Sequence, residues 1–111
     1  MARTEITAQS IDRDGLASAF TAANADGHKL LNNGDQFIIV KNGGASPINV
    51  TIQTPATIEG IAIAEVVIAV AASAEEMIGN FPPSIFNQTD GMIYIDFSAV
   101  TDITVGAFKI A

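Results

Sequence analysis

Residues 36–54 read QFIIVKNGGASPINVTIQT, and this stretch decides the fold class. Its first seven residues are rich in β-branched and aromatic side chains, which favour a strand. The second half alternates apolar and polar residues, which is typical of a strand with one buried and one wet face; the apolar positions are Ile48, Val50 and Ile52. Gly43-Gly44 between the two segments predicts a hairpin with a short loop.

The same alternation recurs along the chain between regularly spaced turn signals. These are Asp26-Gly27, Asn33-Gly34, Asn42-Gly43-Gly44, Gly79-Asn80, Pro82-Pro83 and Asp90-Gly91. The strands we predict cover residues 5–9, 28–31, 36–42, 47–54, 65–70, 75–81, 92–97 and 103–110. Short strands at such spacing predict an all-β fold, a single β-sandwich or jelly-roll-like domain of about eight short antiparallel strands.

Residues 61–72 form the ambiguous apolar segment. The apolar residues change parity around Glu65, from Ile61 and Ile63 to Val66, Ile68 and Val70. One interpretation is a bulge that keeps a single face inward. The other is a strand buried on both faces, with one face covered by a neighbouring subunit. Both interpretations stay open at this point.

The N-terminal part differs from the rest. Residues 10–25 are small, alanine-rich and weakly periodic, and we expect an extended arm or long loop there. The predicted organisation is therefore residues 1–24 as an N-terminal arm, or an edge strand plus a loop, followed by a β-sandwich domain over residues 25–111.

Charge and composition exclude several kinds of partner. Five basic and twelve acidic residues give a net charge of −7, and the basic residues are scattered, which disfavours nucleic acid and an anionic membrane surface. Charged residues make up 15% of the chain, below the usual ~25%, while hydrophobic residues make up 49%. Apolar surface should exceed what one core can hide, which predicts contact with a partner or with further copies. Residues 1–10 carry no signal-like apolar run, and we expect a soluble protein.

The inventory of catalytic residues is thin. There is no cysteine and one histidine, His28, which we expect at the surface at the start of a strand. Most carboxylates sit at turns, where they cap the backbone, and Asp96 falls on the predicted wet face of a strand. Asp12-x-Asp14-Gly15 resembles part of a calcium loop but lacks the other oxygen ligands, so a turn is favoured. We expect no enzyme activity and no cofactor.

The aromatic residues divide into two groups. Phe37, Phe81, Phe97 and Phe108 lie within predicted strands and are expected in the core. Phe20 and Phe86 lie in less regular segments and are expected to anchor a partner, because a buried aromatic contributes most at an interface.

Several phrases of the sequence fit together as one pattern: NNGDQFIIVKNGG at 32–44, PINVTI at 47–52, IGNFPPSIFN at 78–87, DGMIYI at 90–95 and VTDITV at 100–105. In these phrases the chain resembles a family of small proteins of tailed bacteriophages and prophages, the head decoration or cement proteins. The resemblance covers residues 25–111. Two features depart from it: Gly79-Asn80-Phe81-Pro82 stands where relatives carry Gly-Pro-Phe-Pro, and residues 71–74 lack the usual glycine.

The resemblance implies a β-sandwich that binds the outside of an icosahedral shell and stabilises it. The implied partners are the major capsid protein and further copies of the chain, with a trimer preferred, and the implied location is the virion after synthesis in the bacterial cytoplasm. It implies no catalytic residues. The alternatives are a tail or head–tail completion subunit and a carbohydrate-binding module of an adhesin. The interface candidates are Ile6, Ile11, Leu16, Phe20, Ile61, Ile63 and Phe86.

Overall fold

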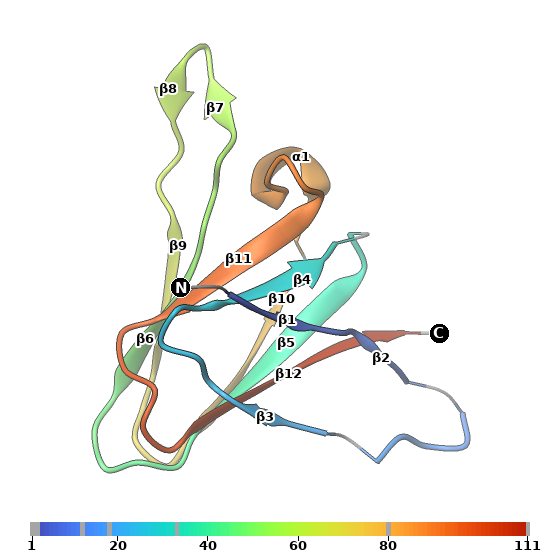
Figure 1. Ribbon diagram of the computed structural model, residues 1–111, viewed down its shortest axis with the longest axis vertical. Helices are drawn as coiled ribbons and strands as arrows, with labels where there is room; N and C mark the ends of the chain where they lie inside the picture. Colours follow the sequence, from blue (N-terminus) through green and yellow to red (C-terminus); the bar gives the residue numbers. More distant parts are fainter. Residues whose placement is uncertain (1–2, 12, 18, 33, 80, 111) are drawn as a thin grey trace.

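The computed structural model describes residues 3–11, 13–17, 19–32, 34–79 and 81–110. Asp12 of the calcium-loop fragment and the turn residues Asn33 and Asn80 lie outside these ranges. The described chain is all-β apart from one short helix (Figure 1). Its elements are β1 (Thr4–Ile6), β2 (Gln9–Ile11), β3 (Thr21–Ala22), β4 (His28–Leu31), β5 (Gln36–Asn42), β6 (Ile48–Ile52), β7 (Thr57–Ile58), β8 (Ile61–Ala62), β9 (Val66–Val70), β10 (Glu75–Gly79), α1 (Pro83–Phe86), β11 (Met92–Phe97) and β12 (Ile103–Ile110).

The strands form two mixed sheets. Sheet A has the order β1-β4-β11-β6-β9, and sheet B has the order β10-β5-β12-β2 with β3 also paired to β12. The pairs β1–β4 and β2–β12 are parallel, and the other pairs are antiparallel. The expectation of purely antiparallel strands was therefore wrong. The reason is that the N-terminal segment runs alongside both sheets in one direction, adding β1 to one and β2 to the other.

The core lies between the two sheets. Alternation in β5 buries Ile38 and Val40, while β6 and β11 of sheet A bury Val50, Ile52 and Ile95 into the same cluster. These side chains are almost fully removed from water, and each such burial stabilises the fold by roughly 1.5–3 kcal/mol. The alternation read from the sequence therefore identified the inward face of β6 correctly.

The Gly43-Gly44 connection is not a hairpin. β5 pairs with β10 and β12, whereas β6 pairs with β11 and β9, so the loop carries the chain from sheet B to sheet A. The buried Asn42 holds this arch: its Nδ2 donates to the carbonyl oxygens of Ser46 (2.8 Å) and Val70 (3.2 Å), and its Oδ1 accepts from the amide of Gly44 (2.9 Å). The local turn signal was right, but the pairing that it predicted was wrong.

All eight predicted strands have a counterpart, with four matching residue for residue: β4, β5, β11 and β12. The sequence interpretation missed the short strands β2, β3, β7 and β8 and the helix α1. The helix begins at Pro83, whose fixed φ suits a first helical residue. It places Phe86 against Phe81, with ring centroids 5.6 Å apart.

The ambiguous segment resolves into two strands instead of one. Within the described ranges, β8 pairs only with β7, in a hairpin that extends away from both sheets (Figure 1), and β9 pairs with β6. The inward-facing residues of β6 lie opposite Val66, Ile68 and Val70. The change in parity of the apolar positions around Glu65 therefore marks the point where the chain leaves the hairpin and enters sheet A. Neither a bulge nor a single continuous strand describes this segment.

Candidate binding surfaces

Each flank of the two-sheet body has two edge strands that follow one another in the chain, one from each sheet. On the first flank these are β1 of sheet A and β2 of sheet B. On the opposite flank, β9 and β10 are the edge strands, joined by a tight turn in which Ser73 has a φ of 61°. The two strands stay close at Val70, which is buried, and a cleft lies between them towards Val66 and Gly79.

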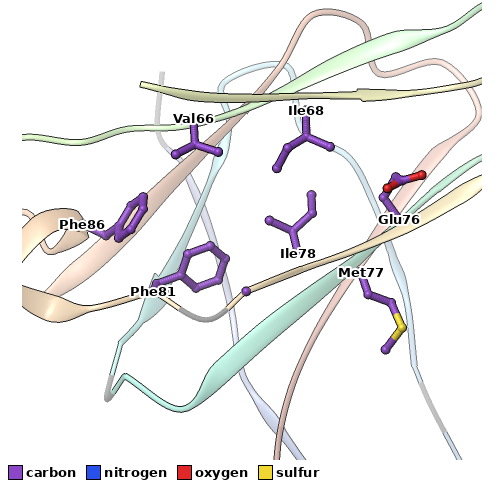
Figure 2. Close-up of a pocket in the computed structure, with 8 residues that line it drawn as sticks. Val66, Ile68, Glu76, Met77, Ile78, Phe81 and Phe86 are labelled. Atoms are coloured by element: carbon purple, nitrogen blue, oxygen red, sulfur yellow. The ribbon is translucent and has the colours of Figure 1, made fainter. Parts of the chain in front are cut away.

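This β9–β10 cleft is lined mostly by apolar side chains (Figure 2). It encloses about 330 Å³. Val66 and Ile68 approach from β9, Ile78 from β10, and Phe81 and Phe86 close the end beside α1. Glu76 stands at the mouth, and its carboxylate is the charged group of the lining. The cleft therefore suits an apolar side chain brought in from outside.

A second apolar surface covers the outer face of sheet B, and we call it the sheet-B face. It holds a cavity of about 250 Å³ lined by Ile11, Leu16, Phe37, Ile39, Met77 and Phe108. The register places Met77 beside Ile39, and Phe37 beside Phe108 with ring centroids 5.7 Å apart. Met77 keeps 67% of its surface exposed. A sheet face facing water is usually polar, so this one is suited to contact with another surface.

Phe20 covers part of the sheet-B face. Its ring lies 5.8 Å from that of Phe108, and Lys41 Nζ lies 4.0 Å from its centroid on the same side of the sheet. Gly106 makes this approach possible, because a Cβ there would lie 2.9 Å from the Ala19 carbonyl oxygen and 3.2 Å from the Phe108 ring. The end of the N-terminal arm is therefore packed on the domain.

The hairpin of β7 and β8 gives a third apolar surface. Ile61 is 71% exposed there, the highest value among the large hydrophobic residues described. The hairpin turns at Glu59 and Gly60, both with positive φ (50° and 82°). Among the described residues, β7 and β8 pair with each other and with no strand of sheet A or sheet B, so the tip of the hairpin lies away from the core.

The polar candidates His28 and Asp96 serve the fold. Asp96 Oδ1 accepts from Arg3 Nη1, and Asp96 Oδ2 accepts from Gln53 Nε2, both at 2.7 Å. His28 is fully buried, which corrects the expectation of a surface residue: it begins a strand, but its ring is turned inward against Phe97. Its Nε2 accepts from the Asn24 amide at 3.0 Å, which leaves Nδ1–H to donate to the Thr4 carbonyl at 3.1 Å.

That arrangement requires a neutral imidazole. Burial lowers the pKa of His28; the Thr4 carbonyl opposes this shift, and the Arg3 charge adds to it. A ring held neutral with both nitrogens engaged by the backbone ties β1 and the Asn24–Gly27 turn to sheet A. His28 thus acts as a structural link between the N-terminal segment and the domain.

The interface candidates fall into three groups. Ile11, Leu16 and Ile61 are exposed, and the first two line the sheet-B face. Phe20 and Ile63 are half-buried. Ile6 and Phe86 are buried, because Ile6 points inward from β1 and Phe86 fills the end of the β9–β10 cleft. These last two contribute to the core and offer little surface to a partner.

Sequence reasoning missed Val67 and Met77, which are 57% and 67% exposed. The signal was available in the parity of β9 and β10: once Ile68 and Ile78 are taken as inward, Val67 and Met77 must point outward. Of the predicted core aromatics, Phe81 and Phe108 are buried while Phe37 and Phe97 are half-buried. Phe108 is covered from the outer side, by Phe20.

Among the described residues, no group of three or more His, Asp and Glu side chains is placed to hold a metal ion. The described part of the chain also has no helix with the length and hydropathy of a membrane span. Comparisons with protein-family models, curated proteins and solved structures found no match to this chain.

Proposed function

We propose that this chain is a structural virion protein that binds the outer surface of a phage capsid and stabilises it. The observation that carries the proposal is the apolar surface left on the outside of a domain with few charges. Ile61, Met77 and Val67 are each more than half exposed, on three different surfaces. A protein that bridges neighbouring subunits needs several contact surfaces, whose weak contacts are strengthened by multivalency. The resemblance of residues 25–111 to decoration proteins supports the same proposal.

We propose that the two sheets form a jelly-roll-like β-sandwich. Both sheets bury their inner faces in one cluster. From β4 onward the chain alternates between the sheets at each step except the β6–β9 pair and its β7–β8 hairpin. Such alternation is a feature of sandwiches with crossed connections.

We further propose that the sheet-B face joins copies of the chain, with a trimer preferred. Lys41 lies on this face, with its Nζ 4.0 Å from the centroid of the Phe20 ring. Glu75 stands opposite Lys41 in the register, so the face carries both signs of charge. Copies of an acidic protein meet there with less like-charge repulsion than elsewhere.

The proposal excludes enzyme activity. Its support is that the titratable side chains most suited to catalysis, His28 and Asp96, are both engaged by neighbouring groups of the fold. A structural protein does not need a titratable side chain that is free to react with a substrate.

The test mixes the purified chain with expanded heads of the phage or prophage that encodes it, prepared without this protein. Cosedimentation should show saturable binding, with hundreds of copies per head. Light scattering of the free chain should show an oligomer. A monomer that ignores the heads would overturn the proposal. Six or twelve copies per particle would indicate a connector, and glycan-array binding would favour a carbohydrate-binding module.

A further inference from the structure

The charges of this protein are divided along the sequence. From residue 42 to residue 108 there is no Lys, Arg or His, while seven carboxylates occur: Glu59, Glu65, Glu75, Glu76, Asp90, Asp96 and Asp102. β9 and β10 lie within this stretch. Glu65 immediately precedes β9, and Glu76 stands at the mouth of the β9–β10 cleft; both side chains are exposed. Glu76 therefore places a carboxylate at the mouth of the cleft, and Glu65 places a second one just before the edge strand β9.

The edge of sheet A offers backbone groups for pairing. The amide of Ser98 donates to Asn49 O, and the amide of Gln53 donates to Tyr94 O, so Asn49 and Gln53 use their backbone groups towards β11. Backbone groups alternate in direction along a strand, so the N–H and C=O groups of Ile48, Val50 and Ile52 point towards β9. There these residues pair with Val70, Ile68 and Val66. The N–H and C=O groups of Val67 and Ala69 must therefore point away from β6, towards the open edge.

A strand added at this edge would also reach the cleft. Side chains of neighbouring strands at the same register point to the same side of a sheet. Every second residue of an added strand would share the direction of Val66 and Ile68 and enter the cleft that Phe81 and Phe86 close. Backbone pairing would supply affinity, and the cleft would select apolar side chains at alternate positions.

We propose that β9 binds an extended segment of another protein by β-strand addition, with apolar residues at alternate positions and Lys or Arg flanking them. A second copy is disfavoured at this edge, because it would bring Glu65 and Glu76 of two acidic chains together. The partner's basic flanks would instead meet Glu65 and Glu76. The proposal goes beyond capsid binding and does not require it: the segment belongs to the shell if the proposed function is right.

The probe is a decapeptide of alternating valine and threonine with a lysine pair at each end. Two matched peptides are its controls: one with glutamate pairs, and one with lysine pairs whose alternate backbone amides are methylated. At low salt the lysine peptide should bind about tenfold or more tightly than either control. NMR should place its shifts on β9 and the cleft, with slowed hydrogen exchange at the amides of Val67 and Ala69.

Two sets of variants test the mechanism. A69P removes an outward N–H from an edge strand, where proline is tolerated, and should reduce peptide affinity about tenfold. A69S keeps the N–H and should bind like the wild type. The E65K/E76K double variant changes two exposed side chains and should reverse the preference, binding the glutamate peptide more tightly than the lysine peptide.

Equal binding of the three peptides, or shifts confined to the sheet-B face, would overturn the proposal. So would a wild-type dimer that A69P abolishes, because the occupant would then be a second copy. If A69P unfolds, the charge-reversal variant decides the question alone. If phage heads bind the folded A69P variant as well as the wild type, the capsid proposal stands and this one fails.

Discussion

Arg3 Nη1 lies 2.7 Å from Asp96 Oδ1, and this ion pair joins the start of the described chain to β11 in the middle of sheet A. Arg3 also covers the ring of Tyr94, with its Cζ 4.4 Å from the ring centroid. The pair is partly exposed, with side-chain exposures of 21% and 37%. It fastens β1, which otherwise has β4 as its described strand partner.

Replacing Arg3 with alanine should lower the free energy of unfolding by about 0.5–1 kcal/mol, the range of a partly exposed ion pair. The loss should be local, with faster hydrogen exchange in β1 than in β6. Arg13→Ala is the control, because Arg13 is exposed in the arm. Urea denaturation measures the first effect; equal losses in the two variants would contradict the anchoring role.

The protein should lose stability as the pH falls through about 6.5, the usual pKa of histidine. Burial lowers the folded-state pKa of His28, so below 6.5 the unfolded chain binds a proton that the folded chain does not. The free energy of unfolding must therefore decrease as the pH is lowered from 6.5, until the pH reaches the folded-state pKa of His28. Thermal unfolding between pH 5.5 and 7.5 should show this slope.

His28→Gln is the matched variant for that measurement, since an amide keeps a donor and an acceptor without titrating in the same range. Its stability should depend less on pH than that of the wild type. Identical slopes in the two proteins would show that His28 is not the group responsible.

Leu30 and Leu31 form a matched pair of adjacent residues on opposite faces of β4, with exposures of 1% and 52%. Leu30→Ala should destabilise the fold by about 2–5 kcal/mol, because it opens a cavity in the core. Leu31→Ala should change stability by about 0.5 kcal/mol or less. Chemical denaturation of both variants checks the assignment of faces, and similar losses would mean that the strand is turned differently.

Gly79→Ala should be strongly destabilising for its size. A Cβ at Gly79 would lie 2.6 Å from Phe37 Cβ and 2.9 Å from its Cα, so the edge strand β10 must move away from its neighbour β5; we expect a loss of about 1–3 kcal/mol. Gly60→Asn is the control, since Gly60 has a positive φ, open space around it and a conformation that asparagine tolerates. A thermal shift for the control as large as that for Gly79→Ala would contradict the packing argument.

Ile61→Lys should leave the thermal midpoint nearly unchanged, because Ile61 is 71% exposed at the end of the β7–β8 hairpin. If this hairpin contacts the shell, the same variant should bind phage heads about tenfold more weakly, since a charge would replace a buried apolar contact. Cosedimentation measures this. Val67→Lys places the same charge on the neighbouring edge strand β9, so comparing the two variants shows whether the hairpin or the β9 edge contributes to head binding.

The sequence determined the parts of this protein that depend on local pattern. Residue composition and turn signals located the strands at 28–31, 36–42, 92–97 and 103–110, and alternation identified the buried face of the strand at 48–52, because a side chain's direction along a strand has a period of two residues. Charge counting showed that residues 42–108 carry no basic side chain. The strand positions depend on neighbouring residues, and the charge distribution follows from counting residue types, so neither requires knowledge of the tertiary structure.

Only the tertiary structure decided which strands pair and which edge stays open. Gly43-Gly44 looks like a hairpin turn whether the next strand pairs with β5 or crosses to the other sheet, and the buried amide of Asn42 settles the crossing through contacts with Ser46 and Val70. His28 is buried because β1, from a distant part of the chain, lies over it. Pairing and burial of this kind depend on contacts between residues far apart in sequence, and so does the cleft between β9 and β10.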